Sequence, residues 1–318
     1  MCVSCPFNSV STGNNSQKCD DCSNETYSND ANTQCLPKVP DIFDYNSKTA
    51  VALSVLCILG STASVASGLM FYWKRDTPLV MASSKTHSYA IAAALALGFQ
   101  TVFFYIGYPT DISCKLKSIV AGLHVTFIIS VFCAKLYIIR KLFNANVVTS
   151  SKKWFYKSWF AVCILTCLHF IYNIIYESLD PSEVVKDFSY IRILPVFCKT
   201  SDTKFLTVSI FQLILSTVCS IFSFRARLLP KRFQDTRLLW FIMFTMCIML
   251  CISTSAHFLL GSSTRTQTID SIFILVLNYL ILVMYYIPKL YIIFFKPIRN
   301  TRPIFMNKFY NRKSIKQN

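Results

Sequence analysis

The sequence contains little glycine and few charged residues for its length. Of its 318 residues only 7 are Gly, against 27 Phe, and 15% are charged while 53% are hydrophobic. A water-soluble core of this size does not hold so many aromatic side chains, so the composition argues against a soluble globular domain. In hydrocarbon every backbone polar group must be satisfied within its own segment, so long apolar runs indicate membrane helices.

Patterns that would indicate an enzyme or a transporter are also missing. The sequence has no zinc-protease, P-loop or nucleophile-elbow motif, and its long apolar segments hold almost no acidic residues. It lacks the internal repeat and the mid-segment Gly and Pro residues that are typical of transporters. We therefore expect a protein that is not an enzyme and needs no cofactor. The net charge of +17 gathers in particular loops, so we expect no nucleic-acid partner.

Seven apolar segments occupy most of the chain after residue 48. Each is close to the roughly 20 residues that a helix needs to cross about 30 Å of hydrocarbon. The sequence thus predicts an all-α membrane protein, a seven-helix bundle over residues 49–295. The segments are Thr49–Trp73, Thr86–Gly107, Leu116–Ile139, Trp154–Tyr176, Phe205–Phe224, Leu238–Leu260 and Ile269–Phe295.

The third segment indicates the orientation. Cys114 lies at one end of it, and a cysteine there is useful only where disulfides persist. The basic residues Lys135, Arg140 and Lys141 lie at the other end, and such a cluster is typical of the cytoplasmic side. We therefore expect a multi-pass plasma-membrane protein with an extracellular N-terminus and a cytoplasmic C-terminus.

Charge counts agree with this orientation. With Lys135 and Lys289 counted, the predicted inner loops and the basic tail 296–318 hold 22 Lys or Arg and two Asp or Glu, whereas the outer side holds 10 basic and 13 acidic residues. This asymmetry is the pattern that sets membrane topology. The basic inner surface should attract anionic headgroups, so membrane lipids are expected partners.

Residues 1–40 form a small, polar, cysteine-rich module, and residues 41–48 a linker. Two interpretations of the cysteines remain open, a disulfide-rich extracellular module or a structural zinc site with four thiolates. The module's cysteines are Cys2, Cys5, Cys19, Cys22 and Cys35. Asn14 and Asn24 begin glycosylation sequons, which fit an exported module.

One further pair of cysteines lies on the predicted outer side. Cys198 lies in the longest outer loop, Glu177–Lys204, and Cys114 precedes the third helix. Two cysteines on one oxidising face seldom stay unpaired, so we expect a Cys114–Cys198 disulfide that holds this loop over the third helix.

Local motifs along the helical part resemble those of class C (family 3) G-protein-coupled receptors, and among them the metabotropic glutamate receptors. The cysteine-rich module followed by seven helices resembles the same family, although only the last part of its cysteine-rich domain is present. The matching stretches are Arg75–Ala82, Tyr108–Thr110 before Cys114, Cys133–Lys135, Phe224–Arg237 and Ile287–Pro297.

The resemblance implies a receptor that passes an extracellular signal to a heterotrimeric G protein. It implies an ion pair between Lys135 and Asp235 at the inner ends of the helices. The alternative is that the Lys135 side chain extends to the lipid headgroups. It also implies a helix kink at Pro288 with an anchor at Lys289. Candidate contacts with the G protein are Arg140, Lys141, Lys152, Lys153, Arg227, Lys231 and Arg232.

Two departures from the family leave a second interpretation open. Leu250 and Ser255 stand in the sixth helix where the family often has Trp and Pro. Nothing in the chain encodes the family's bilobed ligand domain, so we expect the agonist site to lie elsewhere. The alternatives are a non-signalling decoy or regulatory membrane protein, or a truncated receptor fragment. Family members form dimers, so a homodimer or heterodimer is a further candidate assembly.

Polar residues within the helices suggest internal contacts. We expect neutral, hydrogen-bonded side chains for His124, His169 and His257, since buried charge is costly. Asn173 and Asn278 are expected to donate hydrogen bonds between helices. A cavity between the outer halves of the helices is a candidate site for a small apolar modulator.

Overall fold

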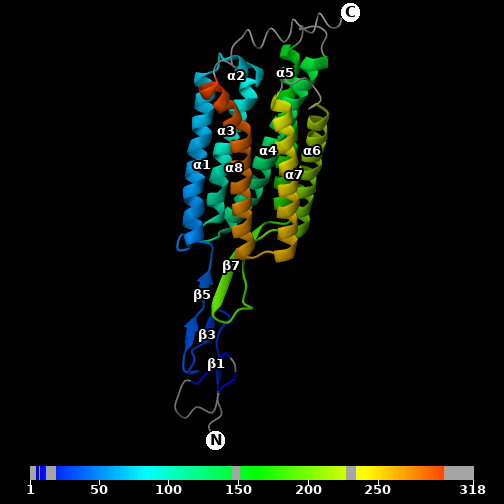
Figure 1. Cartoon of the computed structure of the whole chain (residues 1–318). Helices are drawn as coiled ribbons and strands as arrows, with labels where there is room; N and C mark the ends of the chain where they lie inside the picture. The colour runs from blue at the N-terminus through cyan, green and yellow to red at the C-terminus, as the bar shows by residue number, and fades with distance from the viewer. Residues whose placement is uncertain (1–4, 7, 12–18, 145–150, 227–233, 297–318) are drawn as a thin grey trace, which may run out of the picture.

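The computed structural model describes residues 5–6, 8–11, 19–144, 151–226 and 234–296. Seven long helices stand side by side, and a strand-rich module extends from one end of the bundle (Figure 1). We call this end of the bundle the module end and the opposite end the far end. The long helices are α1 (Lys48–Trp73), α3 (Lys85–Gln100), α4 (Asp111–Asn144), α5 (Ser151–Leu179), α6 (Asp202–Ala226), α7 (Gln234–Leu260) and α8 (Thr264–Phe295).

All seven predicted membrane segments are confirmed as helices. Within the described residues, seven helices are long and apolar enough to cross a membrane. One of these spans is formed by α3 together with the 3-10 turn η1 (Thr101–Tyr105). The helices extend beyond several predicted ends. For example, α4 begins at Asp111 rather than at residue 116. Polar first turns cause the difference, because hydropathy underestimates a helix whose ends lie outside the apolar region.

Helix α4 lies at the centre of the bundle. In its most apolar stretch 61% of the residues are buried, against 22% in α5 and in α7. The core around it is rich in aromatic side chains, and Phe71, Phe99, Phe132, Tyr285 and Tyr286 are the largest that are fully buried. Many outward-facing apolar side chains on the other helices remain exposed, as expected of surfaces that face lipid.

Two glycines allow helices to approach closely. A Cβ atom at Gly60 of α1 would overlap the ring of Phe99 from α3. A Cβ atom at Gly98 of α3 would overlap the ring of His124 from α4. Small residues at such positions let large side chains from the neighbouring helix fill the interface.

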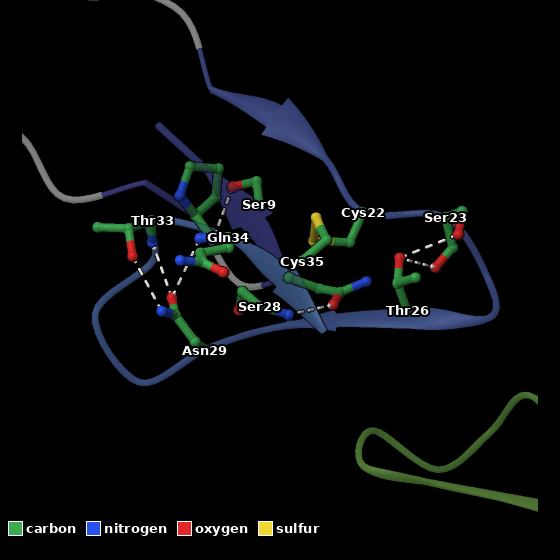
Figure 2. The surroundings of a disulfide bond; sticks show 11 residues. Ser9, Cys22, Ser23, Thr26, Ser28, Asn29, Thr33, Gln34 and Cys35 are labelled. Atoms are coloured by element: carbon green, nitrogen blue, oxygen red, sulfur yellow. Dashed lines mark hydrogen bonds between the residues drawn. A yellow bond between two sulfur atoms is a disulfide. The ribbon is translucent and has the colours of Figure 1, made fainter. Parts of the chain in front are cut away.

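Short strands and disulfides hold the module together. Strand β1 (Ser9–Val10) pairs with β2 (Asp20–Asp21), and β3 (Thr26–Ser28) pairs with β4 (Cys35–Pro37), both antiparallel. Figure 2 shows the Cys22–Cys35 disulfide beside this second pair of strands. In the turn that connects these strands, the Asn29 side chain donates a hydrogen bond to the Thr33 hydroxyl and accepts hydrogen bonds from the Thr33 and Gln34 amides. A module with so small a core depends on such cross-links for its stability.

A three-stranded sheet joins the module to the bundle. Strand β5 (Val39–Asp41) runs parallel to β7 (Ile193–Lys199), and β7 pairs antiparallel with β6 (Glu183–Lys186). The sheet therefore combines the chain just before α1 with the hairpin between α5 and α6. Because Val39–Asp41 is part of this sheet, the boundary that the sequence analysis placed after residue 40 falls inside a strand.

The remaining elements begin or end at recognisable residues. The short helix α2 (Pro78–Ala82) has Pro78 at its first position, where a missing N–H costs no hydrogen bond. The Ser263 hydroxyl accepts a hydrogen bond of 3.2 Å from the Thr266 amide and caps α8. Pro288 lies inside α8 and leaves one carbonyl of the preceding turn without its usual donor.

Candidate functional site

Covalent and ionic contacts connect the module to the helices. A disulfide joins Cys114, near the start of α4, to Cys198 in β7. Lys186 of β6 contacts Glu25 of the module at 2.7 Å, and Arg192 contacts Asp30 at 2.6 Å. These contacts, with the sheet, form a continuous mechanical connection from the module to the module end of α4.

The electrostatics of this junction are those of an exposed surface. A hydrogen bond from Lys186, together with its positive charge, lowers the pKa of Glu25, and the same contact raises the pKa of Lys186. Hydrogen bonds from Ser189 lower the pKa of Asp187 in the hairpin. All three carboxylate and ammonium groups therefore remain charged near neutral pH.

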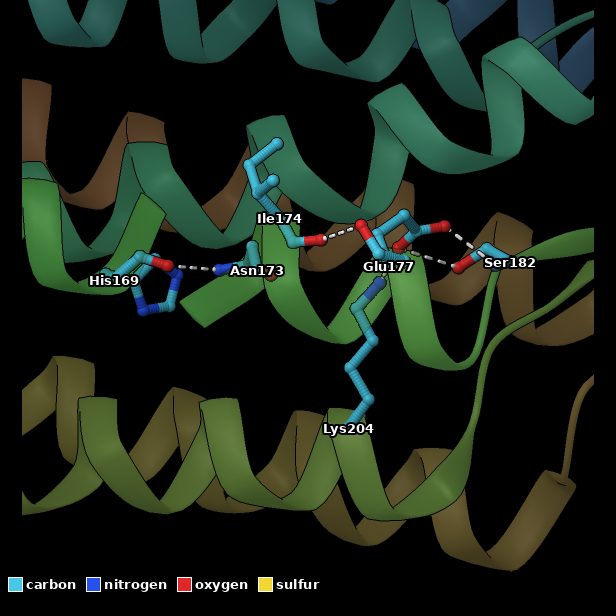
Figure 3. Close-up of polar contacts among 7 residues, drawn as sticks. His169, Asn173, Ile174, Glu177, Ser182 and Lys204 are labelled. Carbon is cyan, nitrogen blue, oxygen red and sulfur yellow. Dashed lines mark hydrogen bonds and ion pairs between the residues drawn. The ribbon is translucent and has the colours of Figure 1, made fainter. Parts of the chain in front are cut away.

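A buried ion pair lies behind the hairpin. The Lys204 ammonium of α6 contacts the Glu177 carboxylate of α5, and their side chains are 1% and 8% exposed. Glu177 also accepts hydrogen bonds from the Ser182 amide at 2.7 Å and from the Ser182 hydroxyl at 3.4 Å (Figure 3). The pair thus fixes α5, α6 and the beginning of the hairpin to one another.

The helices enclose a cavity at the module end. Its volume is about 160 Å³, and residues of α4, α5, α6, α7 and α8 line it, together with Cys198 of β7. Two of its charged residues, Lys117 of α4 and Asp270 of α8, come from helices that face one another across it. The sequence predicts a cavity between the outer halves of the helices, and the structure has this cavity at the module end.

The middle of the bundle contains a polar contact between α4 and α8. His124 and Asn278 are joined at 2.9 Å between Nε2 and Oδ1, so Asn278 accepts a hydrogen bond from another helix. The Asn278 amide donates within its own helix, to the Ile274 carbonyl. Asn173 likewise donates to the His169 carbonyl in its own helix. The prediction that both asparagines donate between helices was therefore wrong, because a helix carbonyl one turn away is the nearer acceptor.

A second polar network lies toward the far end. Lys135 of α4 donates to the Tyr285 hydroxyl, which is 2.8 Å from the Ser88 hydroxyl of α3. The neighbouring Tyr286 donates to the Ser88 carbonyl, and the Lys289 ammonium lies 3.5 Å from the centre of the Tyr285 ring. Lys135 is fully buried, so its side chain does not reach the lipid headgroups. The network joins α3, α4 and α8.

His87 makes a further contact at the far end. Its two ring nitrogens lie 2.8 Å from the Ser84 hydroxyl and 3.4 Å from the Ser158 hydroxyl of α5. The Trp159 ring stacks on it at 4.8 Å. His87 cannot be recognised from the sequence, because a lone histidine shortly after a basic residue has no distinctive spacing.

The predicted site residues divide between described and undescribed parts of the chain. Arg140, Lys141 and Lys153 are exposed at the far end of α4 and α5, and Asn24 is exposed on the module. Asp235 belongs to α7, but its side chain is not among those described, and the same holds for Lys152 in α5. Cys2, Asn14, Arg227, Lys231 and Arg232 lie outside the described residues.

The cysteines of the module are paired in the structure. Cys5 bonds Cys19, and Cys22 bonds Cys35. The zinc interpretation draws its four thiolates from the two Cys-x2-Cys pairs, and Cys5, Cys19 and Cys22 of those pairs are in disulfides and cannot serve as thiolate ligands.

Within the described residues, seven candidate membrane spans and a disulfide-linked module indicate a seven-span membrane protein. Comparison with protein families places the chain more narrowly. The family described as "7 transmembrane sweet-taste receptor of 3 GCPR" matches residues 43–289, which include most of the helical bundle. The chain therefore belongs to the class C G-protein-coupled receptors, a family of receptors and not of enzymes.

Individual relatives are distant. "G-protein coupled receptor family C group 6 member A" of Carassius auratus is 28% identical over 317 residues, which cover 98% of this chain and 36% of that receptor. "Metabotropic glutamate receptor" of Drosophila melanogaster is 27% identical over 85% of this chain and 28% of its own length. "Extracellular calcium-sensing receptor" of Mus musculus is 26% identical, and the match covers 94% of this chain and 28% of that receptor. The chain thus spans about a third of the length of these relatives.

Proposed function

We propose that the chain is a signalling receptor whose module end faces the extracellular side and whose far end engages a heterotrimeric G protein. The observation that carries this proposal is the family match across residues 43–289, because it includes the helices that contact one another at both ends. The excess of basic residues on the far side supports the orientation.

The contacts described above suggest a route for the signal. A movement of the module would act on β5, and through β7 and the Cys114–Cys198 disulfide on the module end of α4. Helix α4 continues through the core to Lys135, which contacts Tyr285 of α8. The His124–Asn278 and Lys135–Tyr285 contacts join α4 to α8, so a displacement of α4 would act on α8 through these side chains.

At the far end we propose that Lys135 pairs with Asp235 in the resting receptor, and that the exposed Arg140, Lys141 and Lys153 contact the G protein. The burial of Lys135 supports the pair, because a buried ammonium favours a carboxylate partner. The cluster of exposed cations supports the contact, since charged surfaces steer complementary partners. Asn24 is proposed as a glycosylation site, because its side chain is exposed on the module.

A nucleotide-exchange assay tests the proposal. The purified full chain in lipid nanodiscs is mixed with each class of heterotrimeric G protein, and GTP-analogue uptake is measured. We expect basal exchange with at least one class, and a higher basal rate for Asp235→Asn because the resting ion pair is lost. Exchange no faster than with empty nanodiscs, for every class, would instead support the non-signalling decoy.

A further inference from the structure

A cluster of cations lies at the far end, where the chain leaves α1 and enters α3. The Arg75 guanidinium lies 3.7 Å from the Asp76 carboxylate, and the Lys85 ammonium lies 3.6 Å from the same carboxylate. A single exposed carboxylate therefore holds a cation that follows α1 close to a cation that begins α3. With Lys74, the positive charges of this cluster exceed its negative charge by two. Exposed ion pairs of this kind contribute little to folding stability, so both cations remain open to a stronger anion.

An aromatic ring orients the Arg75 side chain. Its guanidinium donates a hydrogen bond of 3.3 Å to the Tyr72 hydroxyl and lies 5.2 Å from the centre of the same ring. The Tyr72 ring in turn lies 6.3 Å from the Tyr89 ring of α3. Contacts with a ring face and a hydroxyl hold the guanidinium in place. A guanidinium held in this way can bind two oxygens of one phosphate at once.

The side chains beside the cations indicate the depth of this cluster in a membrane. Tyr72 and Trp73, at the end of α1, are 57% and 75% exposed. One and two turns before Trp73, Leu69 and Val65 are 63% and 49% exposed. Exposed Trp and Tyr are typical of the headgroup level of a bilayer, and exposed aliphatic side chains of the acyl-chain level. The cations therefore lie at the level of phospholipid headgroups, next to a helix surface that faces acyl chains.

The excess of two positive charges favours a headgroup with more than one negative charge. A phosphate monoester carries a charge of about −1.5 to −2 near neutral pH, whereas phosphatidylserine has a single net negative charge. We propose that this site binds a phospholipid with a phosphorylated inositol headgroup. Its phosphates contact Arg75 and Lys85, and its acyl chains lie along the exposed surface of α1.

This site is separate from the proposed G-protein contacts. Figure 1 shows α1 and α5 on opposite sides of the far end, so a lipid at Arg75 does not cover Lys153 of α5. The lipid proposal rests on the function proposed above only for the leaflet that supplies the lipid. Binding itself requires no G protein, so the two proposals fail separately.

Native mass spectrometry of the purified full chain in detergent tests the proposal, because it counts bound lipids and measures their affinity. The lipid probes are the dioctanoyl forms of phosphatidylinositol bisphosphate, phosphatidylserine and phosphatidylcholine. Inositol trisphosphate provides the headgroup without acyl chains. We expect the bisphosphate lipid to bind about tenfold or more tighter than the other two lipids, a ratio that corresponds to one additional charge contact. Inositol trisphosphate should bind more weakly than the bisphosphate lipid, because it has no contact with α1.

Substitutions identify the cations that hold the headgroup. Arg75→Gln and Lys85→Gln should each weaken binding of the bisphosphate lipid about fivefold, the factor expected for one cation beside an anionic headgroup. Lys157→Gln is the matched control, because Lys157 is exposed on α5 at the far end and its loss changes the net charge equally. This control should leave the affinity unchanged. Asp76→Asn should strengthen binding, since it removes the competing carboxylate, and a misfolded variant would not reproduce such a gain.

Several results would overturn the proposal. Equal affinity for the bisphosphate lipid and phosphatidylserine would show that general charge attraction is sufficient. Equal affinity for the bisphosphate lipid and inositol trisphosphate would show a site for a soluble polyphosphate. Unchanged binding in Arg75→Gln and Lys85→Gln, an equal loss in Lys157→Gln, or weaker binding in Asp76→Asn would place the lipid elsewhere on the chain.

Discussion

The buried ion pair between Glu177 and Lys204 gives the sharpest prediction about stability. Replacing one partner leaves the other charge in a site where the side chains are 1% and 8% exposed. Such a change costs about 3–5 kcal/mol, whereas an apolar pair of similar volume is often nearly neutral. We therefore expect Glu177→Leu to lose about 3–5 kcal/mol.

Lys204→Met should cost less than Glu177→Leu. The carboxylate that it leaves behind keeps the Ser182 amide and hydroxyl as donors, so we expect a loss of about 2–3 kcal/mol. The double variant Glu177→Leu/Lys204→Met should recover most of the stability of the parent chain. In a two-residue cycle the coupling energy then approaches the sum of the two single losses.

Thermal unfolding of the purified chain in detergent measures these effects. At about 2–4 °C per kcal/mol, Glu177→Leu should lower the unfolding temperature by roughly 6–20 °C, and the double variant by only a few degrees. The matched control is Lys186→Met, which removes an exposed ion pair with Glu25 and should leave the unfolding temperature unchanged. The reasoning fails if Glu177→Leu behaves like this control, or if the two single losses simply add in the double variant.

Three further predictions follow from other contacts. Replacing Cys114 with Ser opens a bridge between residues 84 apart, so stability should fall by about 4–5 kcal/mol in denaturant unfolding, and treatment of the parent chain with a reductant should reproduce the loss. Gly98→Ala should lower the unfolding temperature because the new methyl overlaps the His124 ring, and His124→Ala should relieve that effect; a neutral Gly98→Ala would contradict the packing. Because the pKa of Glu25 is lowered, its contact with Lys186 contributes stability at pH values above the ordinary pKa of about 4.5, and this stability is lost as the pH falls through the lowered value. Hydrogen exchange in β6 should therefore rise in that pH range in the parent chain. The Lys186→Gln variant should lack this step.

The helices of the bundle could be predicted from the sequence, because each membrane helix is recognisable from its own apolar residues. Twenty apolar residues in a row identify α6 or α7 without knowledge of any neighbour. The strand β5 gives no such signal. Val39–Asp41 contains a proline and only three residues, and it becomes a strand because β7 lies beside it.

The site was less predictable than the fold for a similar reason. Lys117 and Asp270 are far apart in the chain, and each resembles a residue at the end of a membrane segment. Only the folded bundle brings them to the same cavity. The sequence shows Glu177 and Lys204 only as the two ends of a predicted loop, whereas the structure shows that they contact each other.

The orientation of the seven helices can be measured most directly with epitope tags before Met1 and after Asn318 in intact cells. We expect antibody to reach the tag at Met1 in intact cells and the tag at Asn318 only after the cells are permeabilised. Surface labelling of the Asn318 tag in intact cells would contradict the account, because the far end would then face away from any G protein.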